Sequence, residues 1–140
     1  MIVLDANILI RAILGRRVRQ LIETYSLLGV RLYTPDIAFE DARKYLPPLL
    51  EKRVSPILIY PWHSSIYGRA LSRSYRELYG IFEKEARQRL RGRDETDWPV
   101  LATALGLACP VWTEDPDFFG TGIAVWTTSR IEIFFKAQTK

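Results

Sequence analysis

Apolar positions along this chain fall into two patterns, short uninterrupted runs and longer amphipathic stretches. Runs without a polar interruption are typical of strands that are buried on both faces of a sheet. Such strands are predicted at residues 1–4, 30–33, 57–60, 111–113 and 123–126. Apolar residues three and four positions apart instead predict helices with one buried face. These helices cover residues 8–14, 16–28, 34 to about 47, 65–91, 94 or 96 to about 107, and 129–136.

Residues that favour helix ends support these boundaries. The predicted openers are Asn7, Thr34 followed by Pro35, and Asp94 or Thr96. The predicted stops are Gly15, Gly29 and the pair Pro47-Pro48, and an interruption is expected near Gly80. Strands that alternate with helices predict an α/β sandwich around a mostly parallel sheet. The chain shows no internal repeat or linker, so residues 1–140 are predicted to form a single domain.

Composition restricts the classes of protein that fit. The apolar share of 48% and the charged share of 26% are ordinary for a globular protein. A lone Cys109 excludes an internal disulfide framework, and we expect it to be a buried thiol. A lone His63 excludes a multi-histidine zinc site. No apolar run is long enough to span a bilayer, and the N-terminus lacks the pattern of a signal peptide, so a cytoplasmic location is expected.

Four acidic residues stand where such a sheet would bring them together. Asp5 ends the first apolar run and Asp115 closely follows another, while two more acids lie early in predicted helices, Glu40 and Asp97. Functional groups in parallel sheets gather beyond the carboxyl ends of the strands. Grouped carboxylates repel one another unless a cation joins them, and Mg²⁺ or Mn²⁺ prefers such oxygen ligands. These residues predict a metal-dependent phosphodiester hydrolase.

Each acid also has a purely structural interpretation. Asp5 and Asp97 could cap helices, and Glu40 could pair with Arg43 or Lys44 at helical spacing. Asp115 and its neighbour Asp117 flank Pro116 and could form a turn. The chemical interpretation is favoured because all four acids fall at the same edge of the predicted sheet. Thr113 could orient a carboxylate by a hydrogen bond or could simply favour a strand.

Four segments in order resemble the PIN-domain ribonucleases, the family of the VapC-type toxins of type II toxin–antitoxin pairs. They are Val3-Leu4-Asp5-Ala6-Asn7-Ile8-Leu9, the helix around Glu40, Asp97 with Leu101-Ala102-Thr103-Ala104, and Val111-Trp112-Thr113-Glu114-Asp115-Pro116-Asp117-Phe118. The resemblance implies a three-layer α/β/α sandwich around a mostly parallel sheet of about five strands. It also implies a Mg²⁺- or Mn²⁺-dependent endoribonuclease held by a small antitoxin, with a homodimer as a further expectation.

The resemblance assigns roles by position. Its acidic quartet corresponds to Asp5, Glu40, Asp97 and Asp115, as catalytic residues and metal ligands. Asn7 and Asp117 correspond to auxiliary positions. Asp94 lies one helical turn before Asp97, and Asp41 adjoins Glu40, so each offers an alternative ligand. Asp97 is preferred because the apolar pattern after it fits the motif.

Positive charge suits an RNA substrate. The net charge is +4 and most basic residues are arginine, which binds phosphate bidentately. Four arginines precede Asp94 and are candidates for RNA binding: Arg87, Arg89, Arg91 and Arg93. A solvated helix face paired with glutamates explains the same residues without RNA. Two alternative functions stay open, a catalytically silent RNA- or protein-binding module and an RNA-processing nuclease that is not a toxin.

Overall fold

A computed structural model gives the fold, and it describes residues 1–50 and 71–140. Five strands form one sheet in the order β3-β2-β1-β4-β5, and every neighbouring pair is parallel. The strands are β1 (Ile2–Leu4), β2 (Leu32–Pro35), β3 (Leu71–Ser74), β4 (Val111–Trp112) and β5 (Val125–Trp126). The predicted α/β/α sandwich is confirmed. The strand predicted at residues 57–60 and His63 lie outside the described residues.

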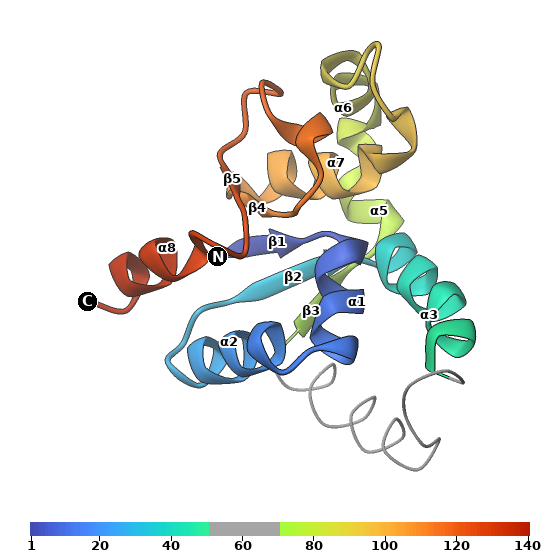
Figure 1. Cartoon of the computed structure of the whole chain (residues 1–140). Helices are drawn as coiled ribbons and strands as arrows, with labels where there is room; N and C mark the ends of the chain where they lie inside the picture. The colour runs from blue at the N-terminus through green and yellow to red at the C-terminus, as the bar shows by residue number, and fades with distance from the viewer. Residues whose placement is uncertain (51–70) are drawn as a thin grey trace.

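Helices cover both faces of this sheet (Figure 1). On one side lie α1 (Ala6–Leu14), α2 (Arg16–Leu27) and, towards one end, α8 (Ile131–Gln138). On the other lie α5 (Arg76–Tyr79), α6 (Glu83–Arg89) and α7 (Trp98–Leu107), while α3 (Asp36–Leu50) flanks the sheet beside α1. Short 3-10 turns complete the chain: η2 (Gly80–Phe82), η3 (Glu95–Asp97) and η4 (Pro116–Phe118).

The central strand β1 has an apolar side chain on each face, as its uninterrupted pattern predicts. Ile2 and Leu4 pack with α1, α2 and α8, whereas Val3 packs with α6 and α7. All three are fully buried. Trp112 extends the first core by packing edge-on against Phe135 of α8, with ring centroids 5.6 Å apart. Core side chains and helices therefore cover both faces of the sheet at β1 and β4, the strands that lead to the candidate site.

The segment after residue 28 differs from its predicted boundaries. Thr34 and Pro35 belong to β2 and do not open a helix, because β2 continues to pair with β3 up to Pro35. Pairing with β1 ends at Tyr33, and a proline is tolerated at the end of a strand. The helix begins at Asp36, whose side chain accepts a hydrogen bond from the Ile37 amide. It ends at Leu50, two residues beyond Pro47-Pro48.

The predicted helix over residues 65–91 is wrong in its first described part, residues 71–74. Leu71–Ser74 form the edge strand β3, which contributes only Leu71 as a core side chain. The expected interruption near Gly80 is confirmed, because η2 separates α5 from α6.

The remaining helix boundaries agree with the predictions to within about two residues. One cap differs: the first helix begins at Ala6 because Asp5, and not Asn7, is its N-cap residue. Cys109 is buried as expected, and burial raises the pKa of its thiol to about 11. None of the helices in residues 1–50 and 71–140 has the length and apolar character needed to cross a membrane.

Candidate functional site

The sheet order reverses direction beside β1, between β1 and β4. Chain segments leaving adjacent strands at such a point diverge to opposite faces, which opens a crevice beyond their carboxyl ends. Asp5 is the first residue after β1, and Asp115 is the third after β4. Val3 pairs with Val111 and Leu4 with Trp112, so the two strands end side by side. Topology alone therefore places these two acids at one point.

Asp5 is buried and saturated with hydrogen bonds. Its Oδ1 accepts from the Ala6 amide at 2.6 Å, which caps α1. Its Oδ2 accepts from Asn7 Nδ2 at 2.6 Å and from the Thr113 hydroxyl at 2.7 Å. Burial raises the pKa of Asp5, and the hydrogen bonds from Thr113 and Ala6 act in the opposite direction. Asp5 therefore caps α1 through Oδ1, while its Oδ2 contacts Asn7 and Thr113, so the cap does not exclude a role in the site.

Thr113 links Asp5 to the chain that carries Asp115. Its Oγ1 donates to Asp5, and it accepts from Asn7 Nδ2 at 3.1 Å and from the Asp115 amide at 3.0 Å. The Asn7 Oδ1 accepts in turn from the Glu114 amide at 3.3 Å. Thr113 is completely buried, so these bonds are shielded from water. Asn7 and Thr113 thus connect the Asp5 carboxylate to the chain segment that leads to Asp115.

Asp97 stands at the N-terminus of α7, opposite Asp5. Its side chain makes no capping hydrogen bond. Burial, followed by the negative charges of Asp5, Asp94, Asp115 and Asp117, raises the pKa of Asp97 to about 7. The carboxyl group therefore experiences the charge of every predicted aspartate of the site. In the described parts of the chain, no ion pair involves Asp5, Asp97, Asp115 or Asp117.

Asp94 is placed differently from Asp97. Its exposed carboxylate caps η3, and its Oδ1 accepts from the Thr96 amide at 2.9 Å and from the Thr96 hydroxyl at 2.5 Å. These hydrogen bonds lower the pKa of Asp94. Asp94 is thus stabilised as a local cap, whereas Asp97 is held in an environment that disfavours its charge. This contrast favours Asp97 as the third acid of the site.

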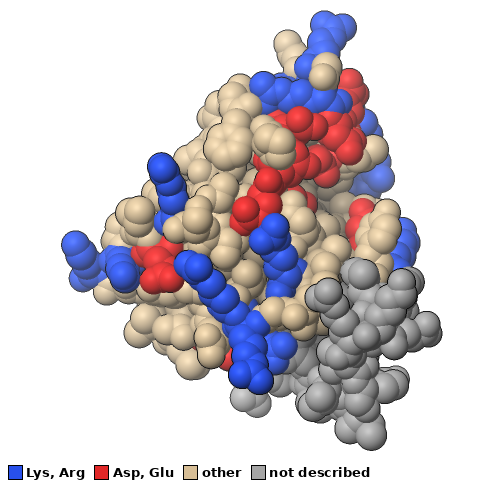
Figure 2. Space-filling model, in the orientation of Figure 1, with Lys and Arg blue, Asp and Glu red and all other residues tan. Residues whose placement is uncertain are grey.

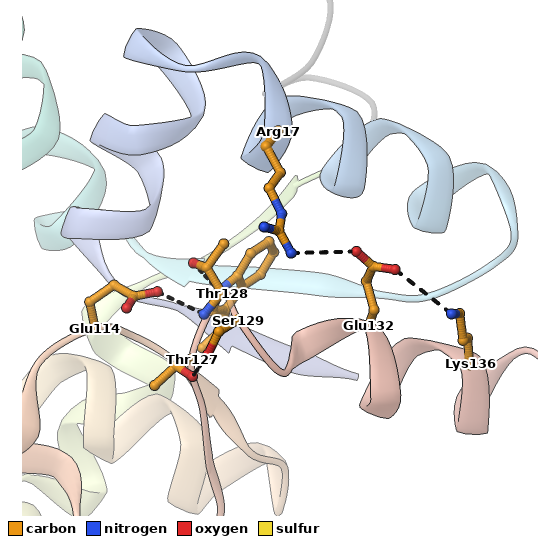
Figure 3. Close-up of polar contacts among 8 residues, drawn as sticks. Arg17, Glu114, Thr127, Thr128, Ser129, Glu132 and Lys136 are labelled. Atoms are coloured by element: carbon orange, nitrogen blue, oxygen red, sulfur yellow. Dashed lines mark hydrogen bonds and ion pairs between the residues drawn. The ribbon is translucent and has the colours of Figure 1, made fainter.

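Asp115 and Asp117 lie on one turn, which η4 forms. The Asp117 amide donates to Asp115 Oδ1 at 2.8 Å, so Asp115 caps this short turn. The Asp94 amide donates to Asp117 Oδ2 at 3.1 Å, which joins the turn to the segment before Asp97. Glu114 is excluded from the group because its Oε1 accepts from the Thr128 amide at 2.7 Å (Figure 3).

Glu40 occupies a separate part of the same edge. It is exposed on α3, and it is not among the charges that raise the pKa of Asp5 or Asp97. Its charge acts instead on Tyr79, whose hydroxyl donates to Asp36 Oδ1 at 2.6 Å. Burial, and then Asp36, raise the pKa of Tyr79 far above its usual range. The sequence does not predict the hydrogen bond between Tyr79 and Asp36, because residues 71–74, which precede α5, are predicted to be helical and instead form a strand.

The four candidate arginines divide between two environments. Arg89 and Arg93 donate to backbone carbonyls of the chain after Asp115. Arg87 binds Glu83 at 2.8 Å and lies over the Trp98 ring, 5.1 Å from its centroid. Arg91 is exposed and, with Lys84, Arg87, Gln88 and Glu95, lines an open hollow of about 380 Å³. Of the residues that line this hollow, Glu95 lies two residues before Asp97 in the chain.

The donor set fits a hard divalent cation by its chemistry. Asp5, Asp97 and Asp115 supply only oxygen ligands, and burial, followed by the charges of neighbouring aspartates, raises the pKa of Asp5 and Asp97. Acidic side chains form a patch on the face shown in Figure 2, with basic side chains at its border. Within residues 1–50 and 71–140, however, no three carboxylate, histidine or cysteine groups already converge on one point. Binding would require the acids to turn towards one another.

Comparisons with known proteins concern the sequence family and the fold. Residues 3–136 match the PIN domain family. A solved structure of FitAB bound to the IR36 DNA fragment has 22% sequence identity and a TM-score of 0.58, over 91% of this chain and 95% of that chain. FitAcB from Neisseria gonorrhoeae has 21% identity and a TM-score of 0.57, over 92% of this chain and 99% of that chain. The two structures share the fold. No curated protein matches the chain.

Proposed function

The chain belongs to the PIN domain family, and on that basis we propose that it is a metal-dependent endoribonuclease that hydrolyses RNA phosphodiester bonds. PIN domains are generally nucleases. The observation that carries the proposal is the raised pKa of Asp97, which Asp5, Asp94, Asp115 and Asp117 cause after burial. Strongly perturbed carboxylates in a crevice are characteristic of functional sites. A structural cluster would be expected to include a neutralising Lys or Arg.

The proposed ligands of Mg²⁺ or Mn²⁺ are Asp5, Asp97, Asp115 and Glu40. Bound there, the cation would supply positive charge against the scissile phosphate and lower the pKa of a nearby water. As a ligand, Asp97 would be held in its ionised form by the positive charge of the cation, which opposes the burial and the neighbouring negative charges that raise its pKa in the metal-free protein. Thr113 and Asn7 fix the direction of the Asp5 carboxylate through their hydrogen bonds. Asp117 supports Asp115 from the same turn.

The substrate RNA is proposed to pass over the hollow lined by Lys84, Arg87 and Arg91. Lys84 and Arg87 lie one turn apart on α6, and Arg91, two residues beyond its end, lines the same hollow. Glu95 lines the same hollow and lies two residues before Asp97 in the chain, which supports a path for the RNA towards the proposed cut site. Trp98 is buried beneath the Arg87 side chain. It therefore supports the Arg87 guanidinium group and does not offer a surface for stacking of an RNA base.

The cleavage assay that tests this proposal compares Mn²⁺, Mg²⁺ and EDTA on single-stranded and structured RNA. Asp97→Asn is expected to abolish cleavage, and Asp94→Asn, one turn away, to retain most of it. Cleavage that persists in EDTA, or in the Asp97 variant, would refute the assignment. A folded wild-type protein that binds RNA but cleaves nothing with either metal would instead support a catalytically silent binding module.

We further propose that the protein is the toxin of a toxin–antitoxin pair, acts in the cytoplasm and forms a homodimer. The support is the likeness to FitAB and FitAcB, together with exposed apolar residues that a partner could cover, such as Leu27 and Leu28 at the end of α2 and Leu78 and Ile81 near η2. Co-purification with the product of a short adjacent gene, which suppresses cleavage, is the expected result. An RNA-processing nuclease would show cleavage without such a partner. The mass in solution tests the dimer.

A further inference from the structure

Arg89, the last residue of α6, and Arg93, four residues after it, contact the backbone of one loop of the site. This loop, residues 115–122, carries Asp115 and Asp117 and is called the acidic loop below. Arg89 Nη1 donates to the Thr121 carbonyl at 2.9 Å. Arg93 Nη1 donates to the Asp117 carbonyl at 2.7 Å and also to the Phe119 carbonyl. The three acceptors are alternate residues, so one edge of the loop backbone faces the two guanidinium groups.

We propose that Arg89 and Arg93 are positioning residues, which fix the acidic loop so that Asp115 and Asp117 face Asp97. The loop is anchored from inside by the buried Phe118, whose carbonyl accepts from the Thr121 hydroxyl at 2.8 Å. The arginines add charged donors from α6 and the segment after it, on a loop whose conformation is irregular and in which Gly120 and Gly122 have positive φ angles of +84° and +83°. Charged donors make stronger hydrogen bonds to carbonyls than neutral ones do. The inference rests on the proposed function for its consequence in metal binding, but the loop contacts stand independently of it.

Close packing of the guanidinium groups on the glycines supports this role. A Cβ atom at Gly122 would lie 2.8 Å from Arg89 Nη1, and one at Gly120 would lie 3.2 Å from Arg93 Nη2. The arginines therefore occupy the space that a side chain would need at each glycine. A guanidinium group engaged in this way has fewer donors free for a phosphate. Arg89 also binds Glu85 Oε1 at 2.5 Å, which fixes its orientation.

The same residues were candidates for RNA binding, and the two roles make different predictions. A phosphate contact acts only when RNA is present, and its loss weakens the dependence of binding on salt. A positioning contact acts in the free protein and alters the acids themselves. Residues that orient metal ligands typically change metal affinity tenfold or more when they are removed. Loop order and metal affinity in the absence of RNA therefore separate the two roles.

The test measures amide hydrogen exchange in the metal-free, full-length protein. Arg93→Gln and Arg89→Gln are expected to speed exchange across the acidic loop by about tenfold, with little change in β1 or α7. Arg31→Gln is the matched control, since Arg31 is exposed and precedes β2, at the amino ends of the strands and not at the carboxyl ends where the acids lie. Arg93→Lys should restore part of the protection, because a lysine can still donate to one carbonyl. Unchanged exchange in both glutamine variants would overturn the proposal.

Mn²⁺ titration without RNA provides the second readout. Arg93→Gln is expected to bind Mn²⁺ about tenfold more weakly than wild type, while KM for RNA at saturating Mn²⁺ and its salt dependence stay the same. Unchanged Mn²⁺ affinity with a raised KM and a smaller salt dependence would overturn the proposal in favour of a phosphate contact. If Arg93→Gln does not fold, Arg93→Lys and Arg89→Gln carry both readouts. A wild type without Mn²⁺ binding or cleavage refutes the proposed function, yet loop exchange still decides the role of the arginines.

Discussion

Replacing Asp97 with asparagine is expected to stabilise the protein in the absence of metal. The pKa of Asp97 rises from 3.8 to about 7 on folding, because of burial and of four neighbouring aspartates. The folded protein therefore binds this proton more tightly than the unfolded chain does. The resulting stabilisation is fully present below about pH 4 and is lost as the pH rises through about 7. Asparagine resembles the protonated form at every pH.

The size of the effect follows from these values. A rise in pKa from 3.8 to about 7 corresponds to about 4 kcal/mol in free energy at most. Asp97 is only half-buried, so solvent screening reduces this to about 1–2 kcal/mol. The dipole at the N-terminus of α7 favours the charged form by about 0.5 kcal/mol. The net gain for Asp97→Asn at pH 8 is therefore about 1 kcal/mol, or roughly 3 °C in Tm.

Thermal or urea unfolding from pH 4 to pH 8 in EDTA measures this gain. The stability of the variant should exceed that of wild type at pH 8, and the two should converge near pH 4. Asp94→Asn provides a control of opposite sign. Because hydrogen bonds from Thr96 lower the pKa of Asp94, its charge contributes stability above its unfolded pKa that is lost as the pH falls. Asp94→Asn should therefore be neutral or destabilising at pH 8.

Divalent metal should reverse the comparison between wild type and Asp97→Asn. A ligand that binds only the folded state stabilises it by mass action, by about 2.7 kcal/mol at one hundred times its Kd. Wild type should gain this stability with Mn²⁺, and Asp97→Asn should gain much less. If Asp97→Asn equals or falls below wild type at pH 8 in EDTA, the aspartates do not repel one another as argued. The assignment of Asp97 to an uncompensated acidic site would then be wrong.

Three further outcomes are expected. Thr113→Val should lower the free energy of unfolding by about 2 kcal/mol, because the Asp115 amide and the buried Asp5 carboxylate each lose a hydrogen-bond partner. Denaturant unfolding checks this, with Thr113→Ser as the conservative control. Arg91→Gln should raise KM for RNA and reduce the slope of log KM against log salt by about one, with an unchanged Mn²⁺ affinity as the distinguishing measurement. Gly122→Ala should lower Tm, because its φ of +83° and the nearby Arg89 both oppose a side chain; an unchanged melting curve would contradict this.

The sequence predicts those parts of the site that depend on strand ends. Asp5 and Asp115 follow apolar runs, and parallel strands deliver their next residues to a common edge, so their meeting follows from pattern and topology alone. The choice between Asp94 and Asp97 could not be made in this way. Both lie at possible helix starts, and only the position of Thr96 and the burial of α7 separate a local cap from a site residue.

Other features escape sequence analysis because distant segments decide them. β3 has the polar sequence Leu71-Ser72-Arg73-Ser74 and forms a strand because β2 offers it an unpaired edge, not because its own residues favour one. Arg89 and Arg93 are spaced like residues of a solvated helix face. Their actual partners lie 24 to 32 residues away in the acidic loop, and no local pattern reports them.

Repulsion between the aspartates implies that the site lowers the stability of the metal-free fold. The chain offsets this cost through contacts that do not neutralise the acids. Asn7 and Thr113 donate to Asp5 without adding positive charge, and Arg89 and Arg93 bind backbone carbonyls of the acidic loop instead of its carboxylates. A lysine or arginine paired directly with Asp97 would stabilise the fold more simply, but it would occupy the position proposed for the cation. Contacts that hold the acidic residues in place without neutralising their charges are therefore the arrangement expected of a site that binds metal.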